Sequence, residues 1–163
     1  MSWHVVHSSR HGTARAYAEI LAAHLGTEAH ALGDTDPAGA PLVLVAPIYA
    51  GRIHGLAELR RHSGDPAAVV LVGLMPLDSA RRAEVARTQL GDTPAFQVPG
   101  RIRWADLGLQ ERLMMHTLGA ITRLRRRRTE SDEQFLALLG TDSGDVDLAA
   151  LGPVRAWAEQ ARR

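Results

Sequence analysis

A run of five apolar residues at positions 42–46 (Leu-Val-Leu-Val-Ala) most constrains what this chain can fold into. A strand that is apolar at every position must be covered on both faces, which is typical of parallel sheets between two layers of helices. Residues 67–74 form a second run of this kind, rich in β-branched valine. The sequence therefore predicts an α/β protein with a buried parallel sheet.

Strand and helix patterns alternate around these two runs. Further strands are predicted at residues 3–7, 28–32 and 95–98, the last extendable to 102, and helices at residues 13–25, 56–62 and 79–90. Five strands that alternate with helices favour a doubly wound, five-stranded parallel sheet in the order 2-1-3-4-5. We expect a single domain over residues 1–163, since 163 residues suffice for one full core.

A long, less regular segment follows the last predicted strand and is called the insertion here (about residues 103–146). Residues 106–128 are predicted to form one helix. Its expected apolar face consists of Leu107, Met114, Leu118 and Ile121, with Leu113, Ala120 and Leu124 beside it. The helix is expected to end in the arginine cluster, defined as Arg125, Arg126, Arg127 and Arg128.

Two shorter helices are predicted after the arginine cluster. Ser131 and Gln134 have the spacing of a capping box, which predicts a helix over residues 135–139. A closing helix is predicted over residues 148–161, with Pro153 marking where it properly begins.

In doubly wound sheets, ligands bind beyond the carboxyl ends of the strands, where the winding reverses. The predicted topology brings three loops together at that edge, at residues 8–13 (the first loop), 47–55 and 74–78. The first loop runs from a strand directly into a helix, so its backbone N–H groups and the positive helix end face one spot. The hydroxyls of Ser8, Ser9 and Thr13 and the charge of Arg10 would complete a phosphate site. An ordinary turn with a serine N-cap would use the same residue types.

Composition excludes several activities of doubly wound sheets. The chain has no cysteine and no lysine, which excludes thiol nucleophiles, Schiff bases and the P-loop lysine. Neither G-x-G-x-x-G nor G-x-S-x-G occurs, and the eight histidines are too scattered to suggest a metal site. A mononucleotide fits what remains, with its phosphate on the first loop. Tyr49 and Trp104 are candidates for stacking on its ring, and Gly51 and Gly73 allow close backbone approach.

Three segments carry a resemblance to a known family. They are Ser8-Ser9-Arg10-His11-Gly12, Ala46-x-Ile48-x-x-Gly51-x-x-His54, and Gly100-x-Ile102-Arg103 followed by Asp106 and Met114. These segments resemble the flavodoxin-domain family, and within it the branch of menaquinone-dependent protoporphyrinogen IX oxidases. The resemblance extends over nearly the whole chain and implies that the doubly wound sheet is flavodoxin-like. It implies FMN as cofactor and oxidation of a flat, hydrophobic, anionic small molecule such as a porphyrinogen, with a quinone as electron acceptor.

The resemblance also implies the residues of the site. Those expected to bind FMN are Ser8, Ser9, Arg10, His11, Gly12, Thr13, Ala14, Pro47, Ile48, Tyr49, Ala50, Gly51, Gly73, Leu74 and Met75. Position 14 usually carries a second hydroxyl residue in the family, and here it is alanine. No general acid or base is assigned, and His54 and Arg52 are the nearest candidates to the reactive part of the flavin.

Charge is distributed unevenly along a chain whose formal net charge is +1. Residues 101–128 carry eight arginines and two acids. Together with Arg103 and Trp104, the arginine cluster is expected to contact substrate carboxylates or an anionic membrane surface, each Arg near such a surface contributing about 1 kcal/mol. A solvated helix end is the simpler explanation of the cluster. Nucleic acid is not expected as a partner, because the chain is not basic overall and aromatic residues make up 4%.

The sequence shows no signal peptide and no apolar stretch of 18 residues, so we expect a cytoplasmic protein, either free or peripheral to the inner face of the membrane. An FMN-dependent oxidoreductase is the favoured function. The alternative is a flavodoxin-like binding module that holds no FMN and acts through its basic helix. The sequence leaves the oligomeric state open.

Overall fold

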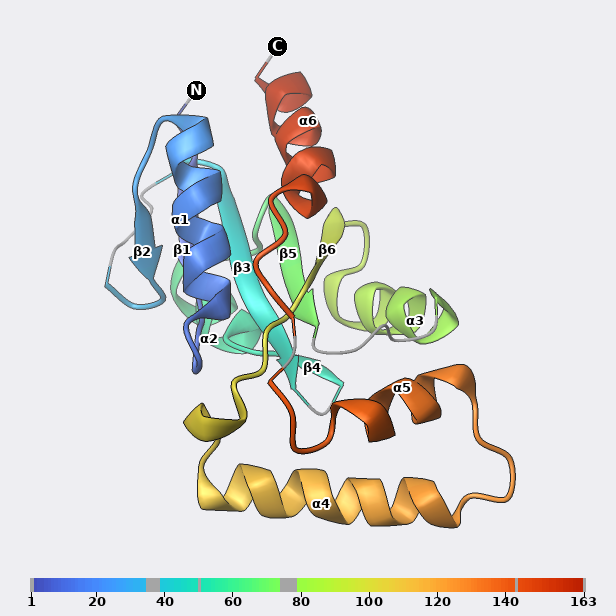
Figure 1. Cartoon of the computed structure of the whole chain (residues 1–163). Helices are drawn as coiled ribbons and strands as arrows, with labels where there is room; N and C mark the ends of the chain where they lie inside the picture. Colours follow the sequence, from blue (N-terminus) through green and yellow to red (C-terminus); the bar gives the residue numbers. More distant parts are fainter. Residues whose placement is uncertain (1, 35–38, 50, 74–78, 143, 163) are drawn as a thin grey trace.

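The computed structural model describes residues 2–34, 39–49, 51–73, 79–142 and 144–162, with the backbone alone for residues 79–83 and 131. A central sheet lies between two layers of helices, and a pair of further helices projects from one end, opposite the two termini (Figure 1). Helices α1 and α6 cover one face of the sheet, and α2 and α3 cover the other. The predicted α/β architecture is confirmed.

Five parallel strands follow one another across the sheet in the order β2-β1-β3-β5-β6. They are β1 (His4–His7), β2 (Ala29–Ala31), β3 (Leu42–Tyr49), β5 (Ala68–Gly73) and β6 (Ala95–Pro99). The order confirms the predicted topology, with the first strand between the second and the third. One short strand was not predicted: β4 (Arg52–Ile53) pairs antiparallel with the end of β3.

The hairpin formed by β3 and β4 (residues 47–55) was wrongly predicted to be an irregular loop. Strand β3 continues past the apolar run through Pro47 and Ile48, and Pro47 still lies opposite Val72 of β5. The chain then reverses near Gly51, whose φ of +74° is readily adopted only by glycine. Glycine and proline in the sequence suggested a loop, but the neighbouring β5 keeps this segment extended.

The helices agree with the prediction on the sheet and differ from it in the insertion. They are α1 (Thr13–Leu25), α2 (Leu56–Ser63), α3 (Ser79–Leu90), α4 (Leu109–Leu124), α5 (Glu130–Leu138) and α6 (Gly152–Ala161), with short 3-10 turns η1 (Trp104–Asp106) and η2 (Ala149–Leu151). The bounds of α1 and α3 equal those predicted, and Pro153 lies in the first turn of α6 as expected.

Alternate residues of β3 enter two separate cores. Val43 and Val45 pack with Tyr17 and Leu21 of α1 and with residues of α6. Leu42, Leu44 and Ala46 pack on the opposite face with residues of α2 and α3. No residue from 43 to 46 has any exposed surface, so the apolar run is buried on both faces as predicted.

The insertion does not contain the single long helix predicted over residues 106–128. Helix α4 ends at Leu124, and Arg125 is extended (φ −65°, ψ 129°), so the arginine cluster lies in the connection after the helix and not within it. The cause is a second helix start close by. The Thr129 hydroxyl accepts from Asp132 N at 3.2 Å, and Asp132 accepts from Thr129 N at 2.9 Å. This capping box replaces the predicted one at Ser131 and Gln134, and α5 therefore begins five residues before the predicted helix.

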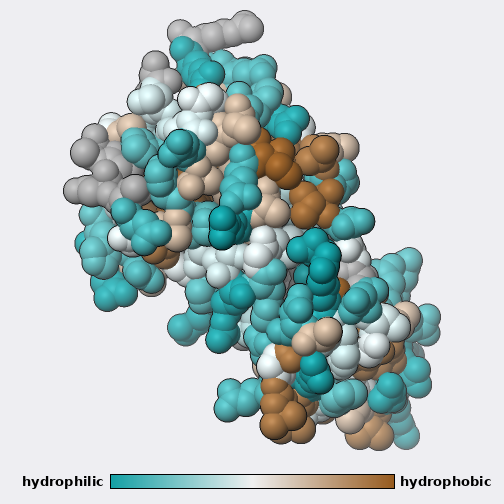
Figure 2. Space-filling view, turned by 60° about the vertical axis from the view of Figure 1, so that its left-hand side comes forward, coloured by the Kyte–Doolittle hydropathy of each residue, from teal (hydrophilic) through white to brown (hydrophobic). Residues whose placement is uncertain are grey.

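The expected apolar face of α4 does not pack on the rest of the protein. Gly119 and Thr122 are the buried positions of this helix, and a Cβ at Gly119 would collide with the side chain of Leu139. Met114, Leu118 and Ile121 are 42%, 44% and 53% exposed. The small residues let α5 approach closely, and the larger apolar side chains face outward, visible as brown areas at the lower end of Figure 2. In the described residues, no helix is long and apolar enough to cross a membrane.

We predict that the Tyr17 hydroxyl contributes strongly to the free energy of unfolding. It donates to Pro99 O and accepts from Asp147 N, both at 2.9 Å, on a side chain with no exposed surface. Tyr17→Phe should cost about 1–3 kcal/mol, because it leaves a carbonyl and an N–H without a partner. Urea unfolding followed by circular dichroism measures this. Tyr49→Phe is the matched control and should cost clearly less, since the Tyr49 hydroxyl has a single partner, the Glu111 carboxylate, which keeps its contacts with Gly108 N and His11. Equal losses would contradict the prediction.

Candidate functional site

The carboxyl ends of β1, β3 and β5 bring the first loop and the hairpin together. Ser8 extends the ladder beyond β1, donating from its N–H to Val45 O at 3.0 Å. Gly73 ends β5, and its carbonyl accepts from Gly100 N at 2.6 Å. Of the predicted cofactor residues, Ala50, Leu74 and Met75 lie outside the described residues. The site is therefore described from two of its three predicted loops.

The N-terminus of α1 has no side-chain cap. Gly12, and not a serine, is the N-cap residue (φ 80°, ψ −12°), and no acidic residue occurs in the first turn. Ser9 Oγ instead accepts from Gly12 N at 3.0 Å, a bond within the turn, so no serine is the N-cap of α1. The N–H groups of the first helical turn are thus left for another acceptor, and their dipole favours a negative one. Thr13 and Ala14 at this helix start are buried, while Arg10 and His11 are exposed.

Ser8 joins the first loop to the hairpin. Its Oγ lies 2.5 Å from Nδ1 of His54, and the Ser8 side chain is buried. His54 is itself held by its backbone, which donates to Pro47 O at 3.0 Å. The sequence named His54 as a candidate near the flavin, and the structure places it against the first loop as a partner of Ser8. Arg52, named with it, is exposed on β4.

Tyr49 lies at the end of β3, next to the positively charged Arg10 of the first loop. The Arg10 guanidinium lies 5.7 Å from the centre of the Tyr49 ring, within the range of a cation–π contact. The phenol donates to Glu111 Oε1 at 3.1 Å. Burial raises the pKa of Tyr49, and the hydrogen bond to Glu111 adds to the rise, so the phenol stays neutral.

Glu111 of α4 was not predicted to belong to the site. Its carboxylate contacts His11 Nε2 at 3.1 Å and accepts from Gly108 N at 3.0 Å, in addition to the Tyr49 hydroxyl. The hydrogen bond from Gly108 is the main cause that lowers the pKa of Glu111, partly opposed by burial, so the group is ionised. The sequence signal for Glu111 is its position three residues after Gly108, as in a capping box. That spacing predicts a contact with the start of α4 and not the contacts with His11 and Tyr49.

Gln89 of α3 was also missed, and it holds the hairpin in place. Its Oε1 accepts from Ile53 N at 3.0 Å, and its Nε2 donates to Gly51 O at 2.6 Å. One amide side chain thus holds the turn and the returning strand β4 of the hairpin that carries Tyr49. A glutamine near the end of an amphipathic helix gives no sequence signal of this kind.

The insertion residues named as substrate contacts have no hydrogen bond to Tyr49 or Glu111 among the described residues. Trp104 packs edge-on against His116 at 5.6 Å between ring centres, and its backbone N–H donates to Asp142 Oδ1 at 2.6 Å. It is therefore held within the insertion, and Arg103 beside it is exposed. The arginine cluster begins fourteen residues after Glu111, about 20 Å away along α4 at 1.5 Å per residue.

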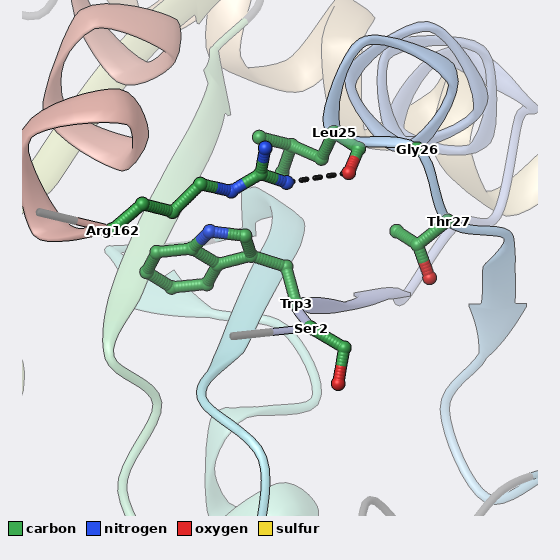
Figure 3. A pocket seen from close by; sticks show the side chains of 6 residues that line it. All are labelled: Ser2, Trp3, Leu25, Gly26, Thr27 and Arg162. Carbon is green, nitrogen blue, oxygen red and sulfur yellow. Dashed lines mark hydrogen bonds between the residues drawn. The ribbon is translucent and has the colours of Figure 1, made fainter.

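An open depression lies at the other end of the sheet, before β1 and after α1. It has a volume of about 590 Å³ and is lined by Ser2, Trp3, Leu25, Gly26, Thr27 and Arg162 (Figure 3). Arg162 donates to Leu25 O at 2.5 Å and so places a positive charge at the C-terminal end of α1. This contact stabilises the helix end and involves none of the predicted site residues.

Gly12 and Gly55 provide a test of how tightly the site is built. They are N-cap residues of α1 and α2 with nearly the same backbone, φ 80° and ψ −12° against φ 78° and ψ −10°. A Cβ at Gly55 would lie 2.7 Å from Leu32 and 2.8 Å from Ser8 Cβ, whereas a Cβ at Gly12 meets nothing within 4 Å. Both alanine variants should lose about 1–2 kcal/mol to the left-handed backbone, and Gly55→Ala about 1–3 kcal/mol more. Chemical unfolding of both variants measures the difference. Similar losses of unfolding free energy would show that Ser8 and Leu32 can move aside at little cost.

The comparison with known proteins agrees with this geometry. A family model described as "Flavodoxin domain" matches residues 4–129, which include the five parallel strands, the first loop, the hairpin and α4. A search of curated proteins finds no match. A match over more than half of the chain, together with the observed sheet order, shows that this chain belongs to the flavodoxin domain family.

Proposed function

We propose that the protein is an FMN-dependent oxidoreductase. The observation that carries this proposal is the start of α1, which has neither a side-chain cap nor an acidic first turn and follows directly on β1. Such a helix end binds phosphate well. Membership in the flavodoxin domain family supports FMN as the phosphorylated ligand.

The residues at the first loop fit a phosphate group. The N–H groups of the first turn of α1 would donate to it, and the Ser9 hydroxyl, which accepts from Gly12 N, still has its own proton to donate. Thr13 would add a second hydroxyl and Arg10 a positive charge, while Ala14 offers its N–H alone. His54 would fix the orientation of the Ser8 hydroxyl.

The hairpin and the end of β5 would hold the flavin ring. Tyr49 would supply an aromatic face, and Gly51 and Gly73 would let the backbone approach the ring edge. FMN, when bound, supplies the hydride or electron transfer, and the protein supplies position and charge. Gln89 would contribute indirectly, because it holds the turn that carries these groups.

The proposed substrate is a flat, hydrophobic, anionic molecule such as a porphyrinogen, with a quinone as electron acceptor. This finer proposal rests on the resemblance to the menaquinone-dependent protoporphyrinogen IX oxidase branch and on the insertion after β6. The insertion adds exposed apolar side chains and seven of the eight arginines within residues 101–128. Exposed apolar side chains and arginines both suit an anionic substrate or an acceptor that partitions into membranes.

We further propose that α4 binds an anionic membrane surface at the inner face of the membrane. Leu109, Leu113 and Leu124 are among its most exposed side chains, and the arginine cluster follows its last turn. Apolar side chains next to arginines are typical of helices that lie in a membrane interface. The distance of about 20 Å from Glu111 favours contact of the arginine cluster with lipid over contact with carboxylates of a substrate beside the first loop.

We predict that purified protein binds FMN and then absorbs near 450 nm, as the flavin does. Ser9→Ala combined with Thr13→Ala should weaken FMN much more than riboflavin, because each lost hydrogen bond to a charged phosphate costs about 1.5–3 kcal/mol. Titration followed by flavin fluorescence gives both dissociation constants. Equal losses of affinity for FMN and riboflavin would show that the phosphate does not bind at the first loop. A protein that ignores millimolar FMN would support the binding module without FMN.

A second prediction concerns the membrane. Arg126, Arg127 and Arg128 are exposed, whereas Arg125 is paired with Asp132 at 2.9 Å. Changing the three exposed arginines to Gln should weaken binding to vesicles that contain anionic lipid and leave FMN affinity unchanged, and added salt should reduce the difference. Arg60, Arg61 and Arg87 changed to Gln serve as control, with the same loss of charge on α2 and α3. Equal vesicle binding by both variants would make the arginine cluster a solvated surface.

A further inference from the structure

A carboxylate of the insertion lies against both described loops of the proposed cofactor site. Glu111 Oε1 is 3.1 Å from His11 Nε2 in the first loop and 3.1 Å from the Tyr49 hydroxyl at the end of β3. The other carboxylate oxygen accepts from Gly108 N, which fixes the side chain at the start of α4. The Arg10 guanidinium contacts the same Tyr49 ring. Glu111 thus supplies negative charge where the start of α1 has none of its own.

This contact also attaches the insertion to the sheet domain. In the described part of the chain, Glu111 is the one α4 side chain that hydrogen-bonds a residue outside the insertion. The other side-chain hydrogen bonds of the helix stay within the insertion, as those of Arg112 to Leu107 and Ala105 do. Whatever displaces the Glu111 carboxylate therefore loosens the N-terminal end of α4.

A phosphate on the first loop and the Glu111 carboxylate would interact unfavourably. Both are anions and both would lie against the first loop, where Glu111 already contacts His11, and like charges at such separations repel even when partly screened. A ligand without phosphate would not experience this repulsion. The carboxylate should therefore discriminate between the phosphorylated and the unphosphorylated flavin.

We propose that Glu111 is an internal competitor of the cofactor phosphate, so that binding of FMN releases the start of α4 from the first loop. This inference rests on the proposed FMN-binding function. The coupling is reciprocal: if FMN weakens the attachment of α4, then loss of the attachment must strengthen FMN binding by the same factor. Cofactor loading would thereby free the helix that carries the exposed apolar side chains.

The test is Glu111→Gln, which keeps the size of the side chain and removes its charge. FMN should bind about three- to tenfold more tightly to this variant than to the unchanged protein, and added salt should shrink the difference. Riboflavin affinity should stay the same. Glu133→Gln is the matched control, because it removes one carboxylate from exposed surface of α5 in the same insertion and should alter neither affinity.

Hydrogen exchange provides a readout independent of affinity. FMN should speed exchange of the amides of residues 112–116 several-fold in the unchanged protein, and in Glu111→Gln these amides should already exchange fast without FMN. Weaker FMN binding by Glu111→Gln, or slower exchange upon FMN addition, would overturn the inference and make Glu111 part of a clamp over the cofactor. Equal FMN affinity of variant and unchanged protein would also overturn it while the proposed function stands. Failure of all variants to bind FMN would overturn both.

Discussion

Burial of β3 on both faces is the constraint on which the rest of the structure depends. A strand without any exposed surface at residues 43–46 needs neighbours on both edges and helices above and below. The chain meets this need with β1 and β5 as parallel neighbours and with α1, α6, α2 and α3 as the two layers. Parallel neighbours in turn require long crossovers, so the five parallel strands all have their carboxyl ends at the same end of the sheet.

That shared end makes a site out of loops that are far apart in sequence. Ser8 meets His54 across 46 residues, and Glu111 meets His11 across 100. The start of α1 is left without a cap in the middle of this end. An uncapped helix start is a cost in the free protein and an advantage when an anion binds, since the ligand then supplies the missing acceptor.

Sequence patterns predicted what depends on local periodicity and missed what depends on long-range contacts. The bounds of α1 and the order of the parallel strands follow from apolar spacing and from topological rules, and both were predicted correctly. The break after Leu124 was missed because the apolar and basic pattern continues through it, while the stop comes from the cap that Thr129 and Asp132 give to α5. Within the candidate site, the sequence named the first loop and His54, and the structure brings them together through Ser8. The roles of Gln89 and Glu111 could not be predicted, because each acts on a backbone or side chain whose proximity only the folded chain reveals.

The two hydrogen bonds of Tyr17 have a consequence for which segment of the chain can change in length. Pro99 stands where the chain leaves the sheet, Asp147 stands where it returns, and one phenolic oxygen holds both. Gly144 lies so close to Gly100 that no Cβ would fit between them. Residues 100–146 thus form a segment whose two ends lie side by side and are held together by these contacts. Such a segment can be lengthened, shortened or exchanged for another without shifting a strand. The first loop and the hairpin would keep their places, while the contacts that Glu111 makes with them would be replaced.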